Sequence, residues 1–259
     1  MLTDSFDFNV INLERRRDRK ERFLEINGKV CGLRFGFVSA VDAQRLDRTK
    51  IRQLGLMAGD SDFAPGFLAC ALSHRQLYLQ AVAAQLPILI CEDDAVFRND
   101  FASRWDSLLK HLPANWDLVL FGYNFDSALA VEIVPGVQQM HGHFNNRPIE
   151  VGEIAAFQQI SQPVILVKLL NAFGSLAYAL SPSGAAKILR DCFPLRPDVV
   201  TVGGLGRSFP AFSLDCLMNR YYPSWNAFAV FPPLAISPND KSTSDTSSSS
   251  TYLNNEAQK

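Results

Sequence analysis

A short apolar run that ends in three consecutive acids constrains this chain more than any other feature. The run from Ile88 to Cys91 is rich in β-branched residues and is followed directly by Glu92, Asp93 and Asp94. Such a run predicts a buried strand, parallel and central in its sheet. Ligands of open α/β sheets bind beyond the carboxyl ends of the strands, so the three acids fall where a ligand is expected.

Three adjacent carboxylates repel one another and are costly to bury unless a positive charge lies among them. A divalent cation is the simplest such charge, because carboxylate oxygens suit Mg²⁺ and Mn²⁺, which in turn bind phosphates. Exposed acids are also common in loops, so a solvated acidic turn is the alternative. The acids alone leave both interpretations open.

Composition excludes several classes of protein. The chain has 259 residues, of which 47% are hydrophobic and 20% charged, as in an ordinary globular protein. Its formal net charge of −1 gives no electrostatic reason to expect nucleic acid or an anionic membrane as a partner. The five cysteines are widely spaced and include no C-x-x-C pair, which argues against a disulfide scaffold or a zinc site and for a reducing compartment.

The N-terminal residues show neither the basic nor the apolar region of a signal peptide, and no apolar run approaches the length of a membrane span. We therefore expect a cytoplasmic protein, with peripheral contact with a membrane left open. Residues 1–240 are expected to form one domain, and the Ser/Thr-rich residues 241–259 a flexible tail.

Strand and helix patterns alternate along the chain, which predicts an α/β fold with a mainly parallel central sheet and helices on both faces. Residues 123–160 break this order, so we expect an irregular insertion that could shape an acceptor pocket. Strands are predicted near residues 6–13, 33–38, 88–91, 117–122, 164–167, 175–180 and 227–231, and helices near 14–23, 65–81, 99–112, 182–189 and 213–219.

Other polar residues give weaker signals. Arg15 and Arg19 follow the first strand, where the phosphates of a nucleotide lie in a doubly wound fold, although most charges there suit a solvated helix face. There is no G-x-G-x-x-G and no Walker loop. His74 lies within a helical pattern, where a lone histidine is usually structural. His141 and His143 have a spacing that can bind a metal from a strand, but a solvated loop is the expectation.

Five blocks of sequence stand out in order: residues 10–19, 66–74, 88–96, 174–185 and 214–215. Taken together and in this order, they resemble glycosyltransferase family 25, the lipopolysaccharide and lipooligosaccharide glycosyltransferases, and Ser244-Asp245 resembles the family's closing Ser-Asp. Two departures occur: Ser213-Leu-Asp215 stands where the family has Pro-Val-Asp, and residues 123–160 match no block.

This resemblance implies a GT-A-like nucleotide-sugar fold, a divalent metal (Mn²⁺ or Mg²⁺), and transfer with inversion from a UDP-sugar, most often UDP-galactose. Bacterial members build surface oligosaccharides, and animal relatives glycosylate collagen hydroxylysine. The bacterial role fits the cytoplasmic expectation, since the donor is cytoplasmic and a lipid-linked acceptor is presented at the inner membrane face.

The resemblance also implies roles for single residues. Asp94 and Glu92 match the metal-binding motif, and Glu92 or Asp93 is expected to contact the ribose or a metal-bound water. Asp215 is the candidate general base, with a helix N-cap as its alternative role. His74 is expected to assist catalysis or to orient the phosphates.

Five further positions are expected to bind the donor or to shape the pocket. Arg15 and Arg19 are candidates for the nucleotide, and Asn12 for the uracil or ribose. Gly174 and Tyr178 are expected to shape the donor or acceptor pocket.

Three functions remain open from the sequence. The first is a metal-dependent galactosyltransferase that acts on a lipopolysaccharide, lipooligosaccharide or other glycan. The second uses the same site with another nucleotide-sugar donor, or hydrolyses the donor slowly. The third is a non-catalytic scaffold that binds a nucleotide-sugar, against which the three intact acids argue.

Overall fold

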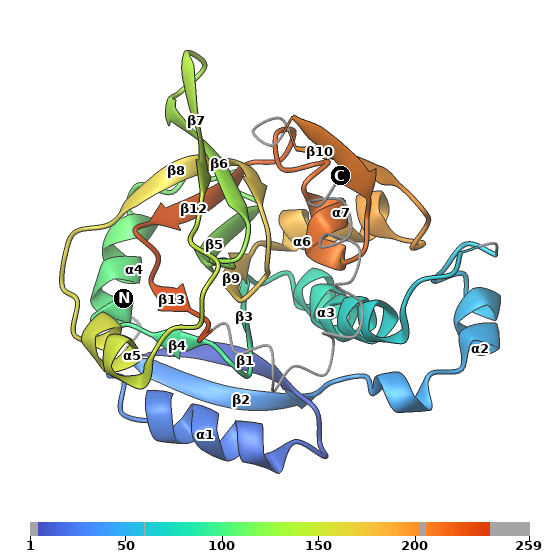
Figure 1. Cartoon of the computed structure of the whole chain (residues 1–259), viewed down its shortest axis with the longest axis horizontal. Helices are drawn as coiled ribbons and strands as arrows, with labels where there is room; N and C mark the ends of the chain where they lie inside the picture. Colours follow the sequence, from blue (N-terminus) through green and yellow to red (C-terminus); the bar gives the residue numbers. More distant parts are fainter. Residues whose placement is uncertain (1–4, 60, 203–205, 239–259) are drawn as a thin grey trace.

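A nine-stranded sheet runs through the molecule, which the computed structural model describes for residues 5–59, 61–202 and 206–238 (Figure 1). The strand order is β2-β1-β3-β9-β5-β12-β8-β6-β7. Its strands are β1 (Phe6–Asn12), β2 (Leu33–Ser39), β3 (Ile88–Glu92), β5 (Leu118–Gly122), β6 (Ala128–Val134), β7 (Gln138–His143), β8 (Ile165–Ala172), β9 (Ala177–Leu180) and β12 (Ala227–Phe231). Two small pairs are β4 (Val96–Phe97) with β13 (Ala235–Ile236) and β10 (Val199–Val202) with β11 (Arg207–Pro210).

The large sheet is mixed. β1 pairs in parallel with β2 and β3, and β5 pairs in parallel with β12, whereas the other neighbouring strands of this sheet are antiparallel. The expected α/β class, compatible with a GT-A-like fold, is confirmed, while the expected parallel pairing holds for these three pairs. One cause is a short connection: a parallel crossover needs a dozen or more residues, and only residues 135–137 separate β6 from β7.

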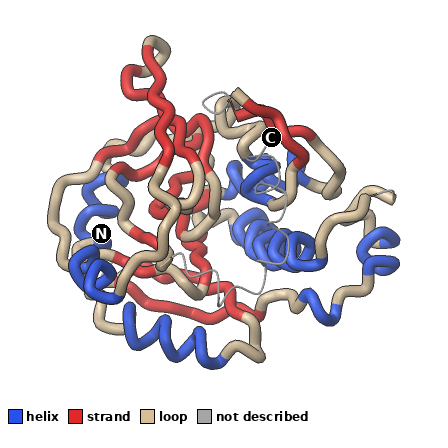
Figure 2. The backbone as a smooth tube through the Cα atoms, viewed as in Figure 1, coloured by secondary structure: helices blue, strands red, loops and turns tan. Residues whose placement is uncertain are grey.

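Helices cover both faces of the sheet, as predicted (Figure 2). Successive side chains of β5 point to opposite faces of the sheet. Leu118 and Leu120 pack in one core with α3 (Pro65–Ala84) and α6 (Pro182–Cys192). Val119 and Phe121 pack in the other core with α1 (Arg17–Asn27) and α4 (Phe101–Leu109). Fully burying one such side chain contributes about 1.5–3 kcal/mol. The helices are α1 (Arg17–Asn27), α2 (Arg48–Gln53), α3 (Pro65–Ala84), α4 (Phe101–Leu109), α5 (Val151–Gln158), α6 (Pro182–Cys192) and α7 (Leu214–Met218), with a 3₁₀ turn at Ala43–Arg45.

The start of α6 follows the sequence prediction. Ser181 is its N-cap, whose hydroxyl accepts a hydrogen bond from the Gly184 backbone N–H, and Pro182 occupies the first turn. A Cβ at Gly184 would lie 2.1 Å from the carbonyl oxygen of Asp117, so only glycine lets α6 approach β5 this closely. This close packing fixes the helix against the centre of the sheet.

The expectation of an irregular insertion at residues 123–160 is wrong. β6 and β7 form a hairpin that extends the sheet, and α5 follows with a capping box made by Glu150 and Glu153. Pro135 and Gly136 lie at the tip of this hairpin. β7 is an exposed edge strand of polar residues, so its sequence lacks the apolar alternation that marks a half-buried strand. His141 and His143 lie on this exposed strand.

Some expectations concern residues outside the described ranges. These are the tail at 241–259 and the Ser244-Asp245 block. Among the described residues, no helix combines the length and apolar character that crossing a bilayer requires.

Candidate active site

The three acids lie at the carboxyl end of β3, as the sequence predicts. Glu92 is the last residue of β3, and Asp93 and Asp94 form the turn that leads into β4. β3 is flanked by β1 in parallel and by β9 in antiparallel orientation. The end of β1 therefore brings Asn12 beside the acids, since Ile11 is in register with Glu92.

Asp93 is held by two groups from the first strand and helix. Its Oδ2 accepts a hydrogen bond from Asn12 Nδ2 at 2.6 Å, and its Oδ1 lies 2.5 Å from the guanidinium of Arg19. Burial raises the pKa of Asp93 against the lowering effect of Arg19. Two predicted donor residues, Asn12 and Arg19, thus lie at the acids, and both contact Asp93.

Of the two carboxylate oxygens of Asp94, one has a hydrogen-bond partner among the described residues. Its Oδ2 accepts a hydrogen bond from Ser237 Oγ at 2.8 Å, just after β13. Its Oδ1 is buried and has no hydrogen-bond partner among the described residues. A buried carboxylate oxygen without a partner is costly, so this atom is the clearest sign that Asp94 faces a ligand.

Glu92 is the most perturbed acid of the cluster. Partial burial, together with repulsion from three neighbouring carboxylates, raises the pKa of Glu92 to about 8. Its side chain is 38% exposed, so solvent screens part of that repulsion. The neighbouring carboxylates are Asp94, Asp215 and Asp93.

His74 lies behind Glu92 in a buried chain of polar side chains. Its Nε2 is 3.9 Å from Glu92 Oε1, and its Nδ1 hydrogen-bonds the Tyr178 hydroxyl at 2.7 Å. Tyr178 in turn donates to the hydroxyl of Tyr78 at 3.0 Å. Burial lowers the pKa of His74 to about 4, so the ring is neutral at neutral pH. Tyr178 is fully buried in β9 and is linked to Glu92 through His74.

Asp215 approaches the same cluster from α7. Its Oδ2 accepts a hydrogen bond from the Gly174 backbone N–H at 2.5 Å, and its charge helps to raise the pKa of Glu92. The N-cap of α7 is Ser213, whose hydroxyl accepts from Cys216 N–H, so Asp215 does not serve as the cap. Gly174 has a φ of +82°, a left-handed conformation that favours glycine, and so contributes its backbone to the site.

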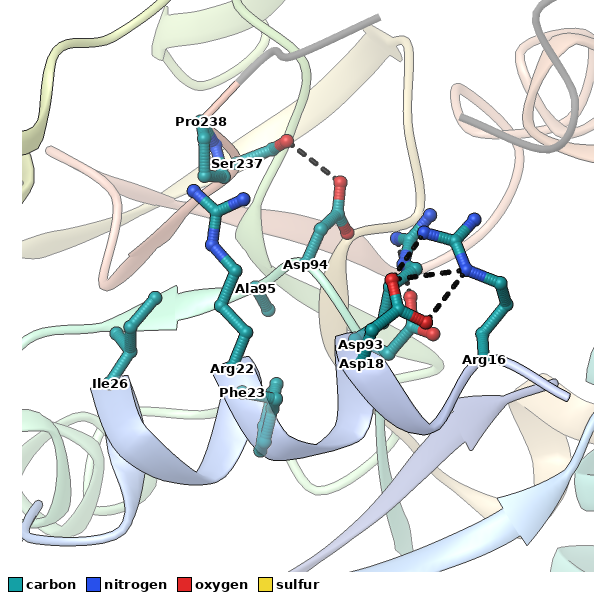
Figure 3. A pocket seen from close by; sticks show the side chains of 11 residues that line it. Arg16, Asp18, Arg22, Phe23, Ile26, Asp93, Asp94, Ala95, Ser237 and Pro238 are labelled. Carbon is teal, nitrogen blue, oxygen red and sulfur yellow. Dashed lines mark hydrogen bonds and ion pairs between the residues drawn. The ribbon is translucent and has the colours of Figure 1, made fainter. Parts of the chain in front are cut away.

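A small hollow of about 70 Å³ lies between α1 and the acids (Figure 3). Arg16, the N-cap of α1, and Arg19 and Arg22 within α1 recur every three residues and line one side. Asp18 on α1 pairs with Arg16, while Asp93 and Asp94 line the other side together with Ala95, Ser237 and Pro238. A hollow with arginines facing carboxylates suits a phosphate group and a cation bound together.

The described residues do not form a complete metal cage: no three His, Cys, Asp or Glu side chains among them are gathered for one. They do fit a cation that a ligand helps to hold. A cation would supply the missing partner of Asp94 Oδ1 and relieve the repulsion that raises the pKa of Glu92. Mg²⁺ is often bound by one or two carboxylates plus water and substrate phosphates.

One residue of the site, Ser237, has a position that no sequence pattern shows. Ser237 reaches Asp94 across 143 residues, and no local pattern links the two. Cys70 lies one turn before His74 on α3. Burial raises the pKa of its thiol, and the nearby charges of Glu92 and Asp215 raise it further.

Arg15, a predicted donor residue, instead pairs with Asp42 at 3.1 Å, near the end of β2.

The fold and the site define a class: an α/β protein compatible with GT-A-like glycosyltransferases, with acids at a central strand end. A family model described as "Glycosyltransferase family 25 (LPS biosynthesis protein)" matches residues 6–199. The chain therefore belongs to glycosyltransferase family 25. The matched stretch includes the three acids, His74 and Gly174, whereas Asp215 and Ser237 lie beyond it.

Similar proteins occur in animals. The chain is 32% identical to the human "Inactive glycosyltransferase 25 family member 3" over 201 residues, which cover 70% of this chain and 28% of the human protein. It is 32% identical over 141 residues to the zebrafish "Procollagen galactosyltransferase 1", covering 46% of this chain and 22% of that protein. A mosquito "Glycosyltransferase 25 family member" from Aedes aegypti is 33% identical over 124 residues, which cover 44% of this chain and 20% of that protein. The chain thus matches less than a third of the length of these relatives.

Proposed function

We propose that this chain is a metal-dependent glycosyltransferase that transfers a sugar from a nucleotide-sugar, with UDP-galactose as the first candidate, to a hydroxyl of a glycan. The observation that supports this best is the cluster of Glu92, Asp94 and Asp215, in which Asp94 Oδ1 is buried without a described partner. Membership of glycosyltransferase family 25 supports the reaction class, and the zebrafish relative's name supports galactose.

Binding of the donor is assigned to the end of β1, to α1 and to the acids. Arg19 lies in the first turn of α1 and pairs with Asp93, so a phosphate that arrives beside Asp93 meets a positive charge already in place. Asn12 fixes the same carboxylate from the other side. Asp94 and Glu92 would hold the divalent cation, which stabilises the charge that develops on the diphosphate leaving group.

The chemistry requires a base on the opposite side of the sugar from the leaving group. We assign this role to Asp215: as the acceptor oxygen attacks the anomeric carbon, its proton passes to the Asp215 carboxylate. The bond from that carbon to the phosphate oxygen breaks, and its electron pair leaves with the nucleoside diphosphate. The Gly174 N–H holds one oxygen of Asp215, which orients the carboxylate toward the cluster.

A screen of donors tests the proposal. Purified chain is incubated with Mn²⁺ and a panel of nucleotide sugars, with released UDP as the readout and EDTA as the control for metal. Calorimetric titration with UDP gives a second readout that needs no acceptor. We expect UDP to bind only with Mn²⁺, and binding to be lost in Asp94→Ala but kept in Asp106→Asn, a change on the surface of α4 where the acid pairs with Lys110.

The word "Inactive" in the human relative's name makes a non-catalytic nucleotide-sugar-binding protein the second candidate. The two candidates differ in the screen. A binding protein releases no UDP from any donor, with or without a glycan acceptor, even where it binds UDP. Failure of UDP to bind in the presence of Mn²⁺ would contradict both.

A further inference from the structure

A second, larger cavity opens beside the residues that follow α7. It has a volume of about 570 Å³ and lies between β7, β8, β10 and the residues that follow α7. Figure 1 shows the β6–β7 hairpin at the top of the view and β10 to its right, above α7. A volume of this size is within the range of small-molecule sites.

The floor of the cavity is polar and buried. Asn171 on β8 is 7% exposed and Asn219, directly after α7, is 2% exposed. Two hydrogen bonds fix the Asn219 side chain: Oδ1 accepts from the Ala172 backbone N–H, and Nδ2 donates to the Ala172 carbonyl. Asn171 Nδ2 donates to the Asn219 carbonyl at 3.5 Å, a length at which a ligand hydroxyl can compete for the amide.

The rim adds hydrogen-bonding groups without adding net charge. Gln139 and His141 on β7 and Thr201 on β10 are exposed and line the opening. Arg220 also lines it, but its guanidinium forms an ion pair with Asp198, which neutralises that charge. None of the described lining residues is acidic, so a cationic ligand has no matched counter-charge there.

Apolar groups complete the lining. Leu170 at the floor, and Val199 and Pro223 at the sides, present aliphatic surface between the amide and hydroxyl groups. Amides, a hydroxyl and an imidazole around aliphatic patches match a ligand with many hydroxyls and exposed C–H groups. An uncharged carbohydrate has this character.

The cavity is one helical turn from the candidate base. Asp215 and Asn219 are four residues apart, which is about 6 Å along a helix axis. Asn219 Nδ2 donates to the Asp215 carbonyl at 3.0 Å, and both side chains bond the backbone that leads from β8 to β9. Asn219, which lines the cavity, is thus hydrogen-bonded to the backbone of the residue that carries the candidate base.

We propose that this cavity binds an uncharged carbohydrate and is the subsite for the acceptor glycan. The acceptor role rests on the proposed function, whereas carbohydrate binding itself does not. The assignment also gives the β6–β7 hairpin a role, since β7 supplies one wall of the subsite.

Saturation-transfer NMR on the full chain tests this with three probes: methyl β-galactoside, methyl β-glucoside and methyl N-acetyl-β-glucosaminide. We expect at least one probe to bind with a dissociation constant on the order of 1 mM, as a small polar ligand does. UDP with Mg²⁺ should not displace it, because the donor site is separate. His141→Ala should weaken binding, and His143→Ala, on the same strand but outside the cavity, should not.

Val199→Trp should fill the opening and reduce the signal at least fivefold. Its matched control is Ile165→Trp, since the two native side chains are 59% and 58% exposed on strands and only Val199 lines the cavity. Three results would overturn the proposal: no signal from any of the three probes, a signal in Val199→Trp equal to that of the native chain, or displacement of the bound glycoside by UDP. It is also overturned if a collagen-like peptide binds where the glycosides do not, and if Val199→Trp abolishes binding of that peptide.

Titration of UDP in the same samples separates this inference from the proposed function. Metal-dependent UDP binding without glycoside binding would leave the transferase proposal standing and reject the subsite. Glycoside binding without UDP binding would keep a carbohydrate site and reject the transferase.

Discussion

The Nδ1 atom of His74 lies 2.7 Å from the hydroxyl of Tyr178, and both side chains are buried. Because Tyr178 donates to Tyr78, the tyrosine proton is used there and His74 must donate from Nδ1. This leaves Nε2 as the unprotonated nitrogen that faces Glu92. The chain of two tyrosines thus sets which tautomer of His74 meets the acid cluster.

Tyr178→Phe should lower the free energy of unfolding by about 1–3 kcal/mol, because it leaves the buried Nδ1–H of His74 without a partner. Urea denaturation measures this change. Tyr222→Phe is the control: the Tyr222 hydroxyl is also buried but has no hydrogen-bond partner among the described residues, so its loss should be neutral or stabilising. Equal destabilisation by both changes would mean that packing, rather than the hydrogen bond, explains the effect.

Glu92→Gln should change how stability depends on pH in the metal-free chain. Since the pKa of Glu92 is raised to about 8, the folded chain binds more protons than the unfolded chain between about pH 4.5 and 8. Stability due to this group is therefore present at low pH and is lost as pH rises through that window. We expect Glu92→Gln to gain stability relative to the native chain from pH 5 to pH 8, measured by urea denaturation with EDTA. A constant difference across that range would contradict the raised pKa.

Gly174→Ala should destabilise the chain by more than about 1 kcal/mol, because residue 174 has a φ of +82°. Its new Cβ would also lie 2.2 Å from Asn124 Oδ1, so that side chain must move. The Gly174 N–H that orients Asp215 would shift with it, and UDP release should fall in parallel. Gly142→Ala is the matched control on β7, where a Cβ meets nothing within 4 Å. Thermal unfolding of both variants decides the result.

Local sequence was enough to predict the parts of the site that follow from one strand or one helix. The apolar run before Glu92 predicts β3, and the acids fall at its carboxyl end. Ser181 followed by Pro182 predicts the start of α6. In each case the signal is a pattern within a few residues, so no tertiary contact is needed to interpret it.

What the sequence could not predict depends on long-range pairing. Ser237 meets Asp94 because β13 pairs with β4, and a two-residue strand leaves no periodic pattern. β7 was missed because an exposed edge strand can be polar on both faces. The interpretation of Asp215 as a possible N-cap needed the structure, which shows Ser213 in that role and the Asp215 carboxylate on Gly174.

Asp215→Asn should lower the transfer rate by about 10²–10⁴-fold, the usual contribution of a general base, with little change in UDP affinity. The fold should survive, because the amide oxygen of asparagine can still accept the hydrogen bond from the Gly174 N–H. Single-turnover transfer to the acceptor, measured beside calorimetric UDP titration, separates the two effects. A parallel loss of rate and UDP affinity would place Asp215 in the donor site, and an unchanged rate would exclude it as the base. Either result would require another group of the cluster to accept the proton.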